Sequence, residues 1–280
     1  MVSNSWDVER LIQLVEENSA EALFVDPLAN LGTYHTTDCH KFSKLLEEHN
    51  WSNKCLIIDD KLVSGRLNVF EIFNKPQHPH ILYFESGNKY LQLGLDLQMA
   101  GIVFVKKQYS SELNTFRFNT GTVIYQTGVA KFPSYNREQF LARMLRLTKN
   151  AEILCACLDS LNQNKKGVVL TFPKNWRELG WSHGGGIVAV TFEEKGENNR
   201  PCLYFLISLI LEESKKGGIP FTKGVSFGFS GIHVSAASAM TQDRPPFLRF
   251  SIGEKSEKEM EKIWSDVKKS FMLFFKKYNL

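Results

Sequence analysis

The sequence has few of the residue patterns that mark metal or redox proteins. Its 280 residues include five cysteines, and no two of them have the C-x-x-C spacing of a zinc or thiol-redox site. The seven histidines are scattered and form no H-E-x-x-H pair. We therefore expect no metal site, and we interpret the cysteines as small apolar residues in a reducing compartment.

Long apolar runs and strong charge are also absent. The longest apolar run, Leu203–Leu211, is far too short to cross a bilayer. The N-terminal residues are polar and lack the apolar core of a signal peptide. A net charge of +4 is small for this length and does not favour nucleic acid as a partner. The sequence predicts a cytosolic protein without a membrane or nucleic-acid partner.

Short apolar runs separated by helical or polar segments organise the first half of the chain. Four of them are typical of buried strands, and they lie at residues 22–26, 55–60, 81–86 and 101–106. Helices are expected after Asp7 and over residues 38–49. This pattern predicts an α/β fold whose parallel sheet is covered on both faces.

A long helix and a second sheet are expected in the rest of the chain. Residues 137–162 contain no proline or glycine and repeat apolar side chains at helical spacing. Beyond them we expect strands and helices in an α+β arrangement. The strands are expected at 167–172, 187–192, 225–229 and 247–252, and the helices at 202–214 and 255–276. We place a domain boundary near residue 150, which gives domains 1–150 and 151–280.

Polar side chains cluster where the first strands end. Asp26 ends the first strand, Asp59 and Asp60 end the second, and the third runs through Ser86 to Lys89. Ligands of open α/β sheets gather at the carboxyl ends of the strands. Turn-capping aspartates and a solvated lysine would account for the same residues, and spacing alone does not decide between the two interpretations.

The order of these residues resembles the cysteine- and methionine-metabolism family of fold-type I pyridoxal-phosphate (PLP) enzymes. In that family a strand ends in Ser-x-Thr-Lys-Tyr, and a glycine-rich stretch then leads to the next strand. The matching residues here are Ser86, Lys89, Tyr90, Gly94, Asp96 and Gly101. The strand that ends in Asp59 resembles the family's strand before the aspartate that faces the pyridine nitrogen. Asn30, in the segment FVDPLAN, matches a family asparagine with the spacing off by one.

The C-terminal third continues the resemblance, which spans residues 5–275. Ser226 and Gly228 match the family's Ser-Leu-Gly block, and residues 239–241 lie near its Ala-Ser-Met-Thr block. Arg249 matches the arginine that grips the substrate carboxylate. The resemblance therefore implies an aspartate-aminotransferase-like fold with a partial large domain and a C-terminal α+β domain.

The resemblance also implies roles for individual residues. Lys89 would be the catalytic lysine that bonds to PLP, and Arg249 and Ser226 would bind the substrate. The residues expected to hold the cofactor are Asp59, Ser86, Asn88 and Asn30. The expected reaction is elimination or replacement at Cβ or Cγ of an amino acid with a sulfur-containing or O-activated side chain.

The sequence departs from the family in ways that bear on its partners. The family has a longer N-terminal part, which carries the phosphate-binding turn and the ring that stacks on the pyridine. Asn88 stands where the family usually has threonine. The chain is then a fragment, or its site is degenerate, or a second chain supplies the missing part; we expect an oligomer completed by such a second chain. A non-catalytic structural subunit and a transaminase are the alternatives.

Overall fold

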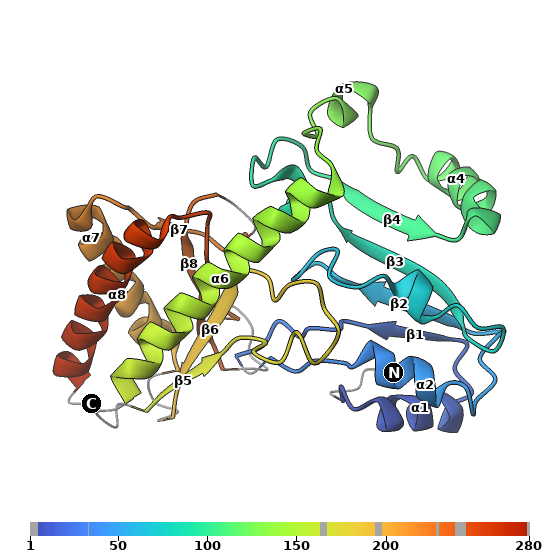
Figure 1. The fold of residues 1–280 in the computed structure, drawn as a ribbon, viewed down its shortest axis with the longest axis horizontal. Coiled ribbons are helices and arrows are strands. Elements are labelled where there is room, and N and C mark those ends of the chain that lie inside the picture. The colour runs from blue at the N-terminus through green and yellow to red at the C-terminus, as the bar shows by residue number, and fades with distance from the viewer. Residues whose placement is uncertain are drawn as a thin grey trace.

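The computed structural model describes residues 5–32, 34–162, 167–193, 198–227, 230–238 and 245–278. Within these ranges the chain forms two sheets with their helices, and the long helix α6 (Arg137–Asn162) runs between them (Figure 1). The fold is therefore α/β with a C-terminal α+β part, as the sequence predicts.

The strands of the first sheet alternate with short helices along the chain. Asp7 and Asp38 accept backbone hydrogen bonds at the starts of α1 and α2, as N-cap residues do. The sheet has the order β1-β2-β3-β4, and β1, β2 and β3 are parallel. Its elements are α1 (Val8–Glu17), β1 (Ala22–Val25), α2 (Cys39–Leu45), β2 (Cys55–Asp59), α3 (Val69–Ile72), β3 (His80–Ser86) and β4 (Gly101–Val105).

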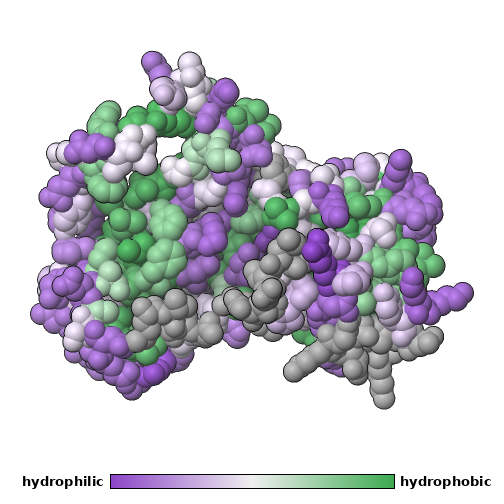
Figure 2. Space-filling model, turned by 180° about the vertical axis from the view of Figure 1, so that it is seen from behind, coloured by the Kyte–Doolittle hydropathy of each residue, from purple (hydrophilic) through white to green (hydrophobic). Residues whose placement is uncertain are grey.

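Two details of the predicted sheet are wrong. Strand β4 runs antiparallel to β3, so the sheet is mixed rather than parallel. One face packs against the helices, since Val25, Leu56 and Ile58 share a core with α1 and α2. The other face is open: Phe24 is 57% exposed and Val103 is 44% exposed. Figure 2 shows an apolar area on the side of the molecule that holds this sheet.

An arm of chain follows β4 and projects away from both sheets (Figure 1). It contains the 3₁₀ turn η2 (Lys107–Tyr109), α4 (Ser110–Asn119) and α5 (Gln126–Val129). No residue of α4 is buried, and Phe116, Phe118 and Tyr125 are exposed. Exposed large apolar side chains that gather in one place commonly mark an interaction surface.

The second sheet has the order β5-β6-β9-β8-β7, and α7 and α8 pack against each other beside it. Asn199 caps the start of α7, and Gly218 ends that helix with a φ of 80°, a left-handed conformation that suits glycine. The elements are α6, β5 (Val168–Thr171), β6 (Ile187–Phe192), α7 (Arg200–Gly217), β7 (Thr222–Lys223), β8 (His233–Ala237), β9 (Phe247–Ser251) and α8 (Glu257–Tyr278).

The strand predicted at 225–229 is wrong for the residues that the structure describes. Val225, Ser226 and Phe227 lie in an irregular segment, because the Val225 carbonyl accepts a hydrogen bond from Arg249 instead of a strand partner. Strand β8, which we did not predict, fills the sheet beside β9. Gly228 and residues 239–241, which we also singled out, lie outside the described residues.

The first sheet has its own apolar core with α1 and α2, but residues that follow its strands join the core of the second sheet. Leu62 and Tyr90 of the first half belong to the same cluster as Leu147 of α6 and Phe250 of β9. The boundary near residue 150 stays a prediction. Over the described ranges, none of the helices is both long and apolar enough to cross a membrane. The same ranges contain no cluster of three or more side chains suited to hold a metal ion.

Candidate active site

The carboxyl ends of β2 and β3 bring the first candidate residues to one edge of the sheet. Asp59 is the last residue of β2, and Lys89 follows β3 at the start of the 3₁₀ turn η1 (Tyr90–Gln92). At the end of β3, the Ser86 hydroxyl donates a hydrogen bond to the side-chain oxygen of Asn88 in the following loop. Asn88 in turn donates to Asp96, with 3.2 Å between nitrogen and oxygen. This chain of contacts orders the loop that carries Lys89.

Lys89 is half-buried and lies over an aromatic ring. Its Nζ atom is 4.5 Å from the ring centroid of Phe227, which belongs to the second half of the chain. Burial lowers the pKa of Lys89, and the positive charges of Arg249 and Lys61 lower it further. A lower pKa leaves more of the amine neutral at physiological pH, and only the neutral amine is a nucleophile.

Arg249 reaches the same ring from strand β9. Its guanidinium carbon is 5.4 Å from the Phe227 centroid, and the residue is only 5% exposed. One terminal nitrogen donates to the side-chain oxygen of Asn30 at 3.1 Å, and the other donates to the Val225 carbonyl. The structure thus brings Asn30, Arg249 and Lys89 together, although they are far apart in the sequence.

Ser226 lies between the two residues that contact Arg249. It is half-buried, and its neighbours are Val225 and Phe227. A role for Ser226 in substrate binding stays a prediction, as do the roles assigned to the other candidate residues.

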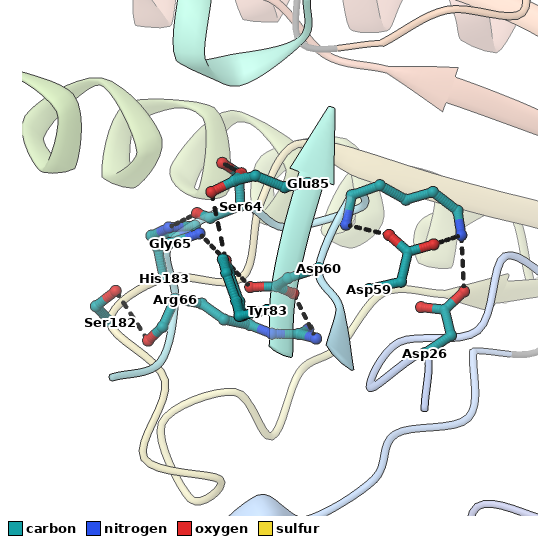
Figure 3. Close-up of polar contacts among 11 residues, drawn as sticks. Asp26, Asp59, Asp60, Ser64, Gly65, Arg66, Tyr83, Glu85, Ser182 and His183 are labelled. Atoms are coloured by element: carbon teal, nitrogen blue, oxygen red, sulfur yellow. Dashed lines mark hydrogen bonds and ion pairs between the residues drawn. The ribbon is translucent and has the colours of Figure 1, made fainter. Parts of the chain in front are cut away.

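Asp59 is buried and forms an ion pair that the sequence analysis missed. The Lys61 ammonium contacts the Asp59 carboxylate, and it lies 3.3 Å from a carboxylate oxygen of Asp26 at the end of β1 (Figure 3). The Lys61 backbone N–H also donates to Asp59, at 3.2 Å. The sequence does contain a sign of this ion pair, since Lys61 directly follows Asp59 and Asp60.

The pKa values of Lys61 and Lys89 are shifted in opposite directions. Burial acts to lower the pKa of Lys61, but the hydrogen bonds and charges of Asp59 and Asp26 outweigh burial and raise it. Lys61 is therefore held as an ammonium ion, whereas Lys89 is the amine that is suited to attack an aldehyde.

A second polar network lies beside these residues, on the left of Figure 3. Arg66 and Asp60 are both buried, and their side chains are 2.8 Å apart. The Tyr83 hydroxyl donates to Asp60 at 3.0 Å, and the guanidinium of Arg66 stacks 3.9 Å from the ring centroid of Trp181. Because Trp181 belongs to the second half of the chain, this network ties the two halves together.

Glu85 extends the network beside the Lys89 loop. It accepts a hydrogen bond from the Ser64 hydroxyl, and the Ser64 carbonyl accepts one from His183 Nε2 at 3.0 Å. Burial raises the pKa of Glu85 from 4.5 to about 8. Burial also lowers the pKa of His183 to about 3, so this histidine is neutral. Neither shift could be predicted from the sequence, because both depend on packing between distant segments.

The Glu85→Gln variant is expected to change how stability depends on pH. Between pH 4.5 and about 8 the folded protein keeps a proton on Glu85 that the unfolded chain has lost. The free energy of unfolding therefore falls as pH rises through this range. Glutamine cannot ionise, so the variant gains stability relative to wild type by up to about 1.4 kcal/mol per pH unit.

Urea unfolding of both proteins at pH 5, 6.5 and 8 measures this difference. The buried polar residue Ser270 on α8 offers a control, because Ser270→Ala removes a hydrogen bond without removing a titrating group. A constant difference between wild type and Glu85→Gln across the three pH values would contradict the raised pKa.

The residues at this edge of the sheet fit the groups of PLP. This edge carries the half-buried amine of Lys89 and the buried carboxylate of Asp59. It also carries the hydroxyl of Ser86 and the amide of Asn88. A lysine can bond to an aldehyde, a carboxylate can face a ring nitrogen, and hydroxyl and amide groups can bind a phosphate. The donor set therefore suits this cofactor.

Comparisons with known proteins agree with this architecture. A comparison with models of protein families gives no match. Among curated proteins, the chain is 38% identical over 256 residues to the bifunctional enzyme flvA of Aspergillus flavus. That match covers 91% of this chain but only 31% of the relative, so the chain spans about a third of the relative's length.

Solved structures give matches over nearly the whole chain. The methionine gamma lyase CalE6 of Micromonospora echinospora superposes with a TM-score of 0.69 at 16% identity, over 94% of this chain and 67% of that one. Cystathionine gamma synthase of Xanthomonas oryzae pv. oryzae gives a TM-score of 0.69 at 14% identity, over 95% and 66%. Cystathionine gamma-lyase of Lactobacillus plantarum gives 0.65 at 15% identity, over 94% and 72%.

These neighbours are PLP-dependent enzymes of fold type I. At such low identities their likeness establishes the fold alone. The chain therefore has the fold of the fold-type I PLP-dependent enzymes, and among them it is similar to the cystathionine gamma synthases and lyases.

Proposed function

We propose that this chain is part of a PLP-dependent enzyme that eliminates or replaces a group at Cβ or Cγ of an amino acid. The observation that carries the proposal is the convergence of Lys89, Asp59 and Arg249. The three residues come from separate elements, and the charges of Asp59 and Arg249 act on the pKa of the Lys89 amine. A lysine of lowered pKa beside specific charge partners is a candidate catalytic group.

The chain's residues have distinct tasks in this proposal. When bound, PLP supplies an electron sink for the electrons released at the substrate Cα. Lys89 would bond covalently to the cofactor, and its free amine would remove the proton from the substrate Cα. Asp59 holds a proton on the pyridine nitrogen by the attraction of opposite charges. The Arg249 guanidinium binds the substrate carboxylate through two parallel N–H groups.

The substrate class follows from the fold neighbours and from Arg249. A buried guanidinium selects a carboxylate, and an α-amino acid carries one beside the amine that reacts. The neighbours are a methionine gamma lyase and cystathionine gamma enzymes. We therefore propose an amino acid with a sulfur-containing or O-activated side chain as the substrate.

We further propose that the active enzyme is an oligomer in which a second polypeptide completes the pocket. Two apolar surfaces support this part of the proposal. The open face of the first sheet exposes Phe24 and Val103, and the arm exposes Phe116, Phe118 and Tyr125. We propose the cytosol as its location, because all five cysteines are free thiols in the structure.

Reduction with borohydride tests the proposed function. The purified chain is incubated with PLP, alone and with any chain that co-purifies with it, then reduced and mapped by mass spectrometry. An adduct on Lys89 supports the proposal, and an adduct that needs the second chain supports the completed pocket as well. The absence of an adduct in both conditions would point to a non-catalytic subunit.

The Arg249→Lys variant is expected to lower kcat/KM by about 10 to 200-fold, the cost of about 1.5 to 3 kcal/mol for a lost charged hydrogen bond. Lysine keeps the charge but cannot hold a carboxylate with two parallel N–H groups. Steady-state kinetics measure the change, and PLP uptake is expected to stay close to wild type. The exposed Arg177→Lys variant is the control. Equal kcat/KM in Arg249→Lys and Arg177→Lys would contradict the carboxylate role.

A further inference from the structure

The ion pair between Lys61 and Asp59 affects how much negative charge Asp59 can present to a cofactor. Asp59 is 5% exposed, and both of its oxygens accept hydrogen bonds from Lys61, one from the backbone N–H and one from the ammonium. An ammonium in contact with this carboxylate cancels the negative charge that would otherwise attract a protonated ring nitrogen. Lys61 by itself therefore opposes the task proposed for Asp59.

Asp26 supplies the charge that is missing. Its carboxylate oxygen lies 3.3 Å from the same ammonium, beside Asp59 (Figure 3). Burial raises the pKa of Asp26 to about 6, so above that pH the two carboxylates and one ammonium carry a net charge of −1, which is the charge that Asp59 would have alone. The neighbouring cation Arg66 does not alter this sum, because it is paired with Asp60 at 2.8 Å.

We propose that Asp26 is a positioning residue that neutralises Lys61, so that Asp59 keeps its negative charge for the pyridine nitrogen of PLP. This inference rests on the proposed function. It assigns Asp26 a role that its position after a strand does not suggest, since an aspartate there is commonly a turn residue. The geometry that carries it is one ammonium shared by two carboxylates at the edge where Lys89 lies.

A charge-rescue experiment in the full-length protein tests the inference with PLP as the probe. In Asp26→Asn the ammonium has Asp59 as its only carboxylate, and the net charge of the cluster becomes zero. We expect PLP to bind at least about tenfold more weakly, since an opposite charge in contact shifts a pKa by about 1 to 3 units. The ring-nitrogen titration, followed by cofactor absorbance, is expected to move to lower pH by about one unit or more.

The double variant Asp26→Asn/Lys61→Gln restores the net charge of −1. Both substituted side chains are neutral amides, so the Asp59 carboxylate carries the charge of the cluster. We expect it to regain PLP affinity to within about threefold of wild type and to return the ring-nitrogen titration toward the wild-type pH. Glu47→Gln is the matched control, since it removes a carboxylate from the exposed Glu47–Lys75 pair and is expected to leave PLP affinity unchanged.

The outcomes separate this inference from the proposed function. Failure of the wild-type protein to take up PLP would overturn both. Uptake by wild type with unchanged affinity in Asp26→Asn would overturn the role of Asp26 alone. A weakened Asp26→Asn variant that the second substitution does not rescue would also overturn it, because a purely structural aspartate would give that result.

Discussion

The Lys89→Ala variant is expected to form no borohydride-stable PLP adduct and to lose turnover by about 10²-fold to 10⁴-fold or more. Alanine removes both the amine that bonds to the aldehyde and the base that removes the Cα proton. The half-buried position of Lys89 and the charges of Arg249 and Lys61 lower its pKa, so a larger fraction of this amine is neutral than of an exposed lysine. Mass spectrometry after reduction and steady-state kinetics measure the two effects.

Two controls make this result specific. The exposed Lys44 on α2 lies away from the site, and Lys44→Ala is expected to match wild type in both measurements. Adding a small primary amine is expected to restore part of the turnover of Lys89→Ala without restoring the adduct, because a free amine can move protons but is not tethered. Full turnover in Lys89→Ala, or an adduct that moves to Lys61 without loss of rate, would contradict the assignment.

The strand ends that carry Asp59 and Lys89 could be predicted from the sequence for a local reason. Each follows a short apolar run, and a polar residue after such a run marks where the buried strand meets solvent. The cap Asp7 was predictable because capping depends on a few neighbouring residues. These signals need no knowledge of how distant segments pack.

Other features depend on packing and were missed. The direction of β4 was not predicted, because its apolar run reads the same in either direction and the intervening residues include a 3₁₀ turn rather than a crossover helix. The shared ammonium of Lys61 could not be predicted, because its second partner, Asp26, lies 35 residues upstream. Arg249 was assigned from the resemblance, but its contact with Asn30 spans 219 residues and needed the structure.

The Arg66→Met variant is expected to lower the free energy of unfolding by about 3 to 5 kcal/mol at pH 8. Arg66 and Asp60 are 2% exposed each, so methionine leaves an unpaired carboxylate in the interior. It also removes the stacking on Trp181, which joins the two halves of the chain. Urea unfolding measures the loss, which is expected to shrink at pH 5, where the unpaired Asp60 can take up a proton.

The exposed Arg177 gives a closely matched control for this loss. It pairs with Glu152 at 3.5 Å and stacks 4.0 Å from the ring centroid of Trp176. An exposed arginine thus makes the same two kinds of contact, an ion pair and an aromatic stack, that Arg66 makes in the interior. Arg177→Met is expected to cost less than about 1 kcal/mol, because exposed ion pairs contribute little. Adding Asp60→Asn to Arg66→Met is expected to recover part of the stability by removing the buried charge. If Arg66→Met cost no more than Arg177→Met, the buried pair would not be what holds the two halves together.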